Sequence, residues 1–333
     1  MEKNNFSNLL LIILLIVVIL VFPCLKNKLL ASNAEINNLR TAETGKCSQG
    51  EYKIYRCSIN ILDYNELPYN NGATSLKKQK YYDDNSIPLH IYHGKMNYHP
   101  CLLAQIGLHL LDVYITSKDK KYLEKAKKIS AKLIGVSLSI NSSIFFPYTF
   151  DFPLHGYKED TMYSPWYSGM AQGQALSFFI RLYEMTKEKY YLQVSKKIFN
   201  SFKMSKPGNG TPWITCVDQD AFLWIEEYPD DPPAHTLNGM IFAIYGLYDF
   251  FRITNDSASE KLLRGAIKTI KFNINKFRTP NGVSNYCLKH PKIRSIRYHK
   301  VHIKQLKMLY KITGDKHFLQ ASQTFSNDTK NIK

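Results

Sequence analysis

The chain has 333 residues, of which 44% are hydrophobic, so it can bury a sizeable core in one large domain or two small ones. Its formal net charge of +17 attracts polyanions such as nucleic acids, acidic lipid headgroups and acidic polysaccharides, although AT-biased coding enriches lysine in the same way. The sequence contains no GxxxxGK[ST], GxGxxG, HExxH or GxSxG motif, which argues against nucleotide binding, a zinc protease and a common serine hydrolase.

The N-terminal segment is strongly apolar. Residues 9–25 are almost entirely Leu, Ile and Val, a run long enough to span or nearly span a bilayer. The small residues of a signal-peptide cleavage site do not follow it directly. We therefore expect residues 1–30 to be an uncleaved transmembrane signal anchor, with the remainder outside the cytoplasm, in the lumen or the extracellular space. Residues 31–96 are expected to form a stalk with short extended or β pieces.

The six cysteines follow no metal-ligand spacing. Cys47 and Cys57 are close enough in sequence for a local disulfide in an oxidising compartment. Cys101, Cys216 and Cys287 are scattered, as buried thiols are. The segment 298–302 contains two histidines without further convergent ligands, so we predict no metal site.

From residue 100 onward the apolar period is helical, and one pattern occurs four times. Each copy is an apolar helix, a Thr at the turn, charged residues and a second helix. One helical hairpin cannot bury both apolar faces, so such hairpins stack side by side. The pattern predicts an all-α fold, an incomplete α/α toroid of helical hairpins within residues 97–333. The copies cover residues 102–126, 170–195, 237–266 and 302–322.

Three long inserts separate the copies, at residues 139–164, 203–234 and 278–300. Short turns at one end of the hairpins and long loops at the other predict a cleft on the long-loop side. Long inserts in a compact domain tend to carry function.

The second and third inserts and the residues just after them are rich in polar and aromatic side chains. A carboxylate facing a tyrosine across a cleft could abstract and return a proton, and a nearby cation such as Lys289, Arg297 or Lys300 would favour the phenolate. Alternatively, the tyrosines anchor loops or pack with exposed hydroxyls. The candidates for chemistry are Glu226, Glu227, Tyr228, Tyr286, Lys289, His290, Tyr298, His299 and His302.

The end of the first insert and the helix after it form a second dense segment, SPWYSGMAQGQ at residues 164–174. Trp166, Tyr167, Gln172 and Gln174 could line a sugar cleft. The alternative interpretation is a tightly packed helix start, in which the glycines allow close helix contact.

At these residues the chain resembles the glucuronyl C5-epimerases of heparan sulfate and heparin biosynthesis. The resemblance rests on SPWYSGMAQGQ, on EEYP followed by LNG and GLYDF (226–250), on NYCLKH (285–290) and on RYHKVHIKQL (297–306). The order and approximate spacing of these motifs agree over roughly residues 98–322.

The resemblance implies an α/α toroid that converts D-glucuronate to L-iduronate within a polymer, without a cofactor. By positional match, Glu227 and Tyr298 exchange the C5 proton, while Tyr228 and Tyr286 assist. Lys289 stands where the family usually has Arg, a partner for the uronate carboxylate, and His290 follows it as in the family. Further substrate contacts are predicted for Trp166, Tyr167, Gln172, Gln174, Glu226, Asn238, Arg297, His299 and His302.

Three departures from the family pattern stand out. Lys289 is a point charge instead of a bidentate fork, Cys287 replaces a common Asp, and Ile296-Arg297 replaces Trp-Asp. Only a short stretch stands where well-studied members have β-rich structure ahead of the helices. The sequence therefore leaves the natural polymer and homodimer formation open.

Two other functions remain at this stage, a uronate polysaccharide lyase and a non-catalytic polyanion-binding surface protein. We expect an anionic glucuronate-containing polysaccharide as partner, membrane attachment through the N-terminal helix and no nucleic-acid partner.

Overall fold

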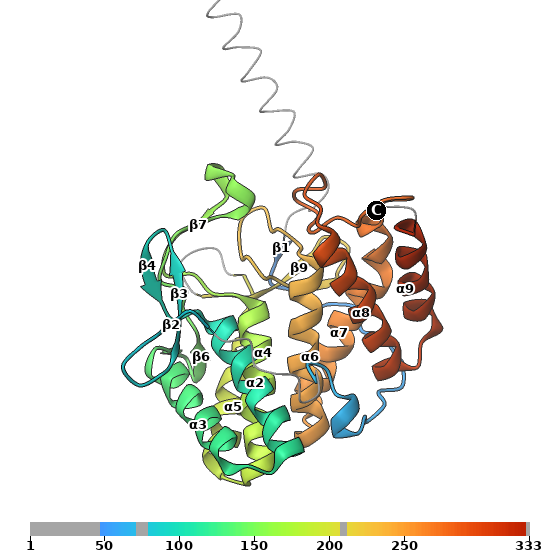
Figure 1. Ribbon diagram of the computed structural model, residues 1–333. Coiled ribbons are helices and arrows are strands. Elements are labelled where there is room, and N and C mark those ends of the chain that lie inside the picture. The colour runs from blue at the N-terminus through green and yellow to red at the C-terminus, as the bar shows by residue number, and fades with distance from the viewer. Residues whose placement is uncertain (1–46, 71–78, 207–211, 331–333) are drawn as a thin grey trace, which may run out of the picture. The chain divides into compact units, whose positions relative to one another are not determined.

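Four helix pairs form the core of the computed structural model, which describes residues 47–70, 79–206 and 212–330 (Figure 1). Each pair is joined by a short turn, and the pairs follow one another along the chain as the repeat predicted. The all-α, incomplete α/α toroid is therefore confirmed. The pairs are α2 (Pro100–Ser117) with α3 (Lys120–Gly135), α4 (Gly169–Thr186) with α5 (Lys189–Ser201), α6 (Leu237–Thr254) with α7 (Ser257–Asn273), and α8 (Ile296–Thr313) with α9 (Lys316–Asp328).

The turns within the four helix pairs have the same backbone conformation and the same hydrogen bonds. The residue after the first helix of each pair has a left-handed backbone and donates its amide to the carbonyl four residues earlier, a common helix ending. The threonine before the turn donates its hydroxyl to the carbonyl four residues earlier. The left-handed residues are Lys118, Lys187, Asn255 and Gly314. The repeated Thr in the sequence thus marks the helix ends.

Helices α4 and α6 approach each other at backbone distance. A Cβ placed on Gly246 would lie 2.2 Å from the carbonyl oxygen of Gly173, and one on Gly173 would lie 2.4 Å from Cα of Ala243. Further along the same two helices, Arg181 and Asp249 form a fully buried ion pair, with Nη2 and Oδ2 2.8 Å apart. The two helices therefore contact each other from Gly173 to Arg181 of α4.

The segment 47–70, which lies within the predicted stalk, packs along the helices. Tyr55 donates its hydroxyl to Asp315 at 2.7 Å, and the amide of Asn60 donates to the carbonyl of Ile312 at 2.7 Å. The segment belongs to the same compact unit as the helices. The predicted anchor, residues 1–30, lies outside the described residues. Within the described ranges, no helix is both long and apolar enough to cross a membrane.

The disulfide predicted between Cys47 and Cys57 is wrong. Strand β1 (Cys47–Ser48) pairs with β9 (Thr215–Asp218), and this pairing brings Cys47 to Cys216, with a Cα–Cα distance of 5.4 Å that suits a disulfide. Cys57 is a free cysteine of intermediate exposure. Cys57 is closer to Cys47 in the sequence, but β1 pairs with a strand of the second insert, and that strand carries Cys216.

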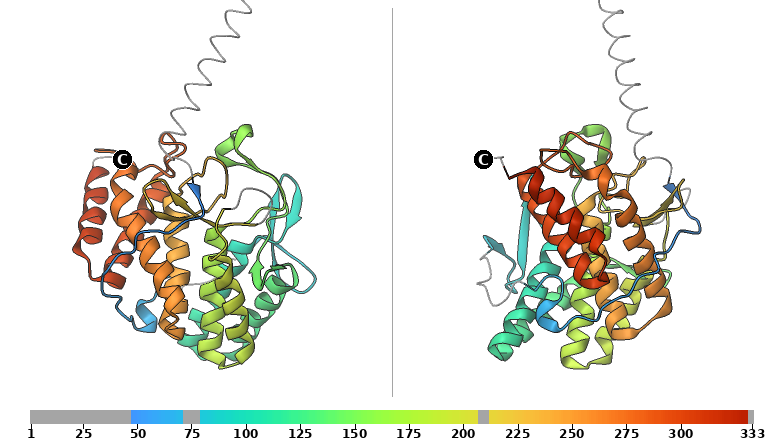
Figure 2. Two further views of the ribbon diagram at one scale, coloured as in Figure 1. Left: turned by 180° about the vertical axis from the view of Figure 1, so that it is seen from behind. Right: turned by 90° about the vertical axis from the view of Figure 1, so that its right-hand side faces the viewer.

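Short strands fill the regions between the helix pairs and the stretch before α2. Figure 2 shows β7, β9 and the chain between α7 and α8 at the same end of the helices. The inserts therefore meet at this end, as the cleft hypothesis requires. The remaining strands are β2 (Tyr81–Tyr82), β3 (Pro88–Tyr92), β4 (Lys95–Asn97), β5 (Leu138–Ile140), β6 (Ser143–Phe145), β7 (Phe152–Pro153), β8 (Thr161–Met162) and β10 (Leu223–Ile225).

Candidate active site

Glu227 lies where the buried strand β10 ends against the first turns of α4 and α6. The amide of Gly169, at the start of α4, donates to the carbonyl of Glu226 at 2.7 Å. A Cβ on Gly239, in α6, would lie 2.2 Å from Oε2 of Glu227. Glycine is therefore required at position 239 if the carboxyl is to keep its position, and the glycine-rich helix starts seen in the sequence position this acid.

The Glu227 carboxyl is 7% exposed and is surrounded by hydroxyl and amide donors. Tyr286 donates its hydroxyl toward both carboxyl oxygens at 3.3 and 3.4 Å, and Asn238 donates its amide at 3.4 Å. The hydroxyls of Tyr228 and Tyr286 are 3.4 Å apart. Burial raises the pKa of Glu227 from 4.5 to about 7, although the hydrogen bonds from the two tyrosines oppose this rise.

Tyr298 lies in the first turn of α8, where it meets Tyr286 edge to face, with ring centroids 4.7 Å apart. Its pKa is raised above 10, chiefly by burial and then by the nearby Glu227 charge, while Arg297 opposes this rise. Tyr298 is therefore protonated at neutral pH, where the Glu227 carboxyl can accept a proton. The four residues predicted to handle the proton are brought together by three separate segments.

A hollow of about 500 Å³ is lined in part by Pro229, the residue that follows Tyr228. Its lining includes Trp166, Tyr167 and Trp213, together with Asp230. Trp166 lies 5.9 Å from Tyr228, centroid to centroid, whereas the four proton-handling residues are not part of the lining. Aromatic rings at the wall of such a hollow suit the apolar faces of sugar rings. Trp166 and Tyr167, predicted to line a sugar cleft, both line this hollow.

Lys289 is 2% exposed and is held by two protein carboxylates. Its Nζ lies 2.7 Å from Asp160 and 2.6 Å from Asp230. Nε2 of His290 lies 2.7 Å from the other oxygen of Asp160. Although burial alone would raise it, the pKa of Asp160 is lowered by Lys289 and His290. Neither aspartate could be identified from the sequence, because they come from different inserts and match no motif quoted above.

Three residues predicted to contact substrate instead brace the loops of the site. Both carboxylate oxygens of Glu226 accept from His235, at 2.9 Å from its amide and 2.6 Å from Nδ1. The side chain of Gln172 accepts from the amide of Phe146 and donates to the carbonyl of Ile144. Gln174 accepts from the thiol of Cys101, and all three predicted residues are fully buried. The packed-helix alternative therefore describes both glutamines.

The histidines of α8 are also internal. Helix α8 begins at Ile296, six residues before the predicted start, so His299 and His302 fall on one buried face of it. Both rings contact Ser284, at 2.9 and 2.8 Å, and both are fully buried. The predicted substrate contacts of these histidines do not agree with this burial. Arg297, on the exposed face, places its guanidinium 5.9 Å from the ring centre of Tyr298.

Comparisons with known proteins show the family of the chain. A family model described as the D-glucuronyl C5-epimerase C-terminus matches residues 141–327. An uncharacterized protein of Methanocaldococcus jannaschii is 25% identical over 219 residues, which cover 64% of this chain and 64% of that protein. D-glucuronyl C5-epimerase of Caenorhabditis elegans is 28% identical over 170 residues, 45% of this chain and 26% of that protein.

Among solved structures, a sugar epimerase from a ruminal bacterium aligns with a TM-score of 0.51 and 15% identity. The alignment covers 72% of this chain and 62% of that chain, and at this identity it shows the fold alone. In all three of these alignments the chain spans less than two thirds of the other protein's length.

Proposed function

Because the chain belongs to the D-glucuronyl C5-epimerase C-terminus family, we propose that it converts D-glucuronate to L-iduronate within an anionic polysaccharide. The main support is the buried carboxyl of Glu227, whose pKa of about 7 allows it to accept a proton at neutral pH. It lies beside tyrosines that remain protonated there and can donate one. The net charge of +17 suits an anionic polymer as substrate.

In the proposed reaction the C5–H bond breaks and its proton moves to the Glu227 carboxylate. The electron pair of that bond passes into the adjacent carboxylate of the sugar and gives an enediolate-like charge, which the site must stabilise. Tyr298 then gives its hydroxyl proton to the opposite face of C5, and proton transfer from Glu227, through Tyr286 or water, restores it. No atom changes its oxidation state overall, and only the configuration at C5 differs.

Lys289 is the candidate for holding the uronate carboxylate. An ammonium group has three N–H donors, and Asp160 and Asp230 occupy two of them. A uronate carboxylate would compete for the ammonium group with Asp230, the more exposed of the two aspartates. Asn238 and Tyr286 hold the Glu227 carboxyl in place and thereby position the base.

The proposal is tested by solvent exchange. The purified chain is incubated with heparosan and with N-sulfated heparosan in deuterated water, and C5 is examined by NMR. We expect deuterium at C5 together with iduronate signals, and loss of both in Glu227→Gln and Tyr298→Phe. Tyr190→Phe, which alters an exposed ring on α5, is the matched control and should retain the activity. An unsaturated uronate product would instead indicate a lyase, and binding without exchange would indicate a non-catalytic protein.

We further propose that residues 1–30 attach the protein to a membrane, with the catalytic unit outside the cytoplasm. The support is the apolar composition of residues 9–25. Extraction of membranes with alkaline carbonate tests this proposal, because an anchored chain stays in the pellet, and its release would contradict the anchor.

A further inference from the structure

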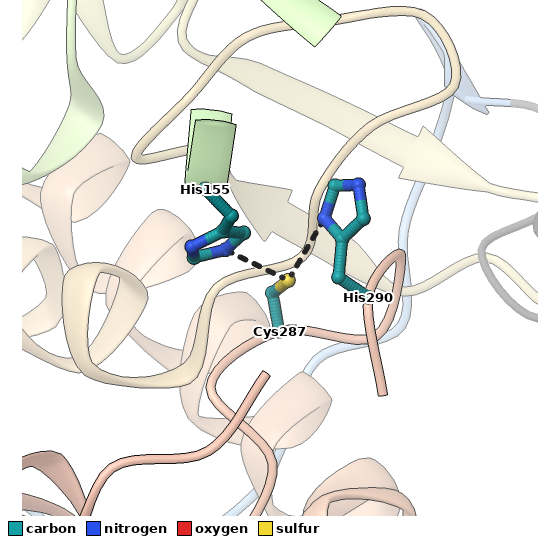
Figure 3. Close-up of side chains that lie close together, drawn as sticks. All are labelled: His155, Cys287 and His290. Carbon is teal, nitrogen blue, oxygen red and sulfur yellow. Dashed lines mark hydrogen bonds between the residues drawn. The ribbon is translucent and has the colours of Figure 1, made fainter. Parts of the chain in front are cut away.

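A thiol and two imidazoles meet beside the proposed catalytic cluster (Figure 3). His155 lies on the short turn η2 (Leu154–Gly156) after β7, while Cys287 and His290 belong to the loop that precedes α8. Sγ of Cys287 is 3.6 Å from Nε2 of His155 and 3.5 Å from Nδ1 of His290. One ligand atom from each of the three residues lies within 4.8 Å of the other two.

The two sulfur–nitrogen separations match the edges of a zinc coordination shell, and the two ring nitrogens lie within 4.8 Å of each other. With Zn–S of about 2.3 Å and Zn–N of about 2.0–2.1 Å in a tetrahedron, sulfur and nitrogen ligands stand about 3.6 Å apart. We propose that Cys287, His155 and His290 form a binding site for Zn²⁺. A thiolate with two imidazoles suits this ion, whereas Ca²⁺ and Mg²⁺ prefer oxygen ligands. Three protein ligands leave the fourth position for water or another small ligand.

The surroundings of His290 are those of a metal-binding histidine. Its Nε2 lies 2.7 Å from Oδ2 of Asp160, and that carboxylate is itself held by Lys289. When Nε2–H donates to the carboxylate, the lone pair of the neutral ring is on Nδ1, which faces Cys287. The ring also stacks on Tyr157 with centroids 4.7 Å apart and planes 6° apart. The imidazole is therefore oriented before any ion binds.

The thiol of Cys287 loses its proton when it binds an ion, because the thiolate is the form of cysteine that binds zinc. Binding forms the Zn–S bond, breaks the S–H bond and releases that proton to the buffer.

The site adjoins the proposed catalytic residues but does not depend on their function. The rings of His155 and Tyr286 meet edge to face with centroids 5.1 Å apart. An ion held here would add positive charge next to the tyrosine that contacts Glu227. Since metal binding can be measured without a polysaccharide, failure of the epimerase proposal would leave this one intact.

Cobalt substitution provides the test. The full chain, purified in detergent and stripped with a chelator, is titrated with Co²⁺, and its absorption is recorded. We expect a thiolate-to-cobalt charge-transfer band that saturates at about one ion per chain and disappears when Zn²⁺ is added. Release of about one proton per Zn²⁺ at pH 7 should accompany binding. Absence of the band in the unmodified chain overturns the proposal without recourse to any variant.

Variants locate the site. Cys287→Ser should abolish the band, whereas Cys57→Ser, which changes another free cysteine, should leave it unchanged. Asp160→Asn, which removes the carboxylate behind His290, should weaken Zn²⁺ binding by about 10–100-fold. A band that survives in folded Cys287→Ser, or equal displacement of Co²⁺ by Ca²⁺, would refute the site. Far-UV circular dichroism confirms that each variant is folded, and His155→Gln replaces any that is not.

Discussion

Replacing Glu227 by Gln is expected to abolish C5 exchange and, at the same time, to stabilise the folded chain at alkaline pH. The carboxyl is buried, and its pKa is raised from 4.5 to about 7 because burial disfavours the charged form. The folded state therefore holds this proton more tightly than the unfolded chain does. The pKa difference corresponds to about 3 kcal/mol of stability that ionisation removes.

The direction of the Glu227 pKa shift determines the pH range in which ionisation lowers the free energy of unfolding. Below about pH 4.5 the carboxyl is protonated in both states, so ionisation has no influence on stability. Between pH 4.5 and 7 the unfolded chain ionises first, and the free energy of unfolding of the native protein falls as pH rises. Glutamine does not titrate. The advantage of the variant should thus be under about 1 kcal/mol at pH 5 and about 3 kcal/mol at pH 8.

Urea unfolding at pH 5, 6 and 8 measures this difference, and C5 exchange measures the loss of function. Glu124→Gln, on an exposed face of α3, is the matched control and should show no pH-dependent gain. A Glu227→Gln variant that is less stable than the native chain at pH 8 would refute the reasoning. An advantage that is equal at pH 5 and pH 8 would refute it as well, because it would not arise from ionisation.

Three further predictions concern the base, its position and the disulfide. The rate of C5 exchange should rise about tenfold per pH unit below pH 7 and level off above it, since the base must be ionised. Tyr286→Phe should move the pH range in which the rate rises to higher pH, because it removes a hydrogen bond that lowers the pKa of the Glu227 carboxyl. Gly239→Ala places a Cβ 2.2 Å from the carboxyl oxygen and should slow exchange by about tenfold or more, whereas Gly135→Ala meets nothing within 4 Å and should not. Cys216→Ser should lower the free energy of unfolding by about 2–5 kcal/mol, and Cys57→Ser should leave it nearly unchanged.

Each of these predictions would be contradicted by a specific result. A pH-independent rate between pH 5 and 8 would contradict the assignment of the base. Equal rates in the two glycine variants would show that the carboxyl position is not critical. Unchanged unfolding of Cys216→Ser in urea would show that the cross-link between β1 and β9 does not stabilise the fold.

The helix pairs could be predicted because their signals are local. Apolar residues at helical spacing and a threonine that marks each helix end act within a few residues, and the structure uses them at all four turns. The inserts carry no such period. The sequence around Lys289 therefore does not indicate its two aspartate partners. The sequence around Cys47 does not indicate its disulfide to a cysteine 169 residues away.

The errors in α8 have a similar cause. The sequence pattern predicts that the third insert continues to residue 300, but the helix starts at Ile296. Once the segment is helical, positions three apart share a face, so His299 and His302 point together into the core. Tyr298, one position before, lies toward the proposed active site. A shift of a few residues in a predicted helix start thus separates a candidate catalytic tyrosine from two structural histidines.

The two aspartates around Lys289 lead to a last prediction, on substrate affinity. Two carboxylates share one lysine next to the place proposed for an anionic sugar, and His290 contacts the other oxygen of Asp160. Asp230 lines the hollow and is 24% exposed, so it competes directly with the uronate carboxylate for the ammonium group. Asp230→Asn should therefore lower KM by about three- to tenfold at low salt and have little effect on kcat.

The adjacent Asp231→Asn is the matched control, because its carboxylate is 77% exposed and pairs with Lys206 instead. It should leave KM nearly unchanged. A higher KM in Asp230→Asn would mean that this carboxylate orients Lys289 for the substrate instead of competing with it. The two roles also differ in their salt dependence. Competition between charges weakens as salt screens them, whereas loss of an orienting contact persists at high ionic strength. Measuring KM at two salt concentrations therefore decides whether Asp230 competes with the substrate carboxylate for Lys289 or orients Lys289 for the substrate.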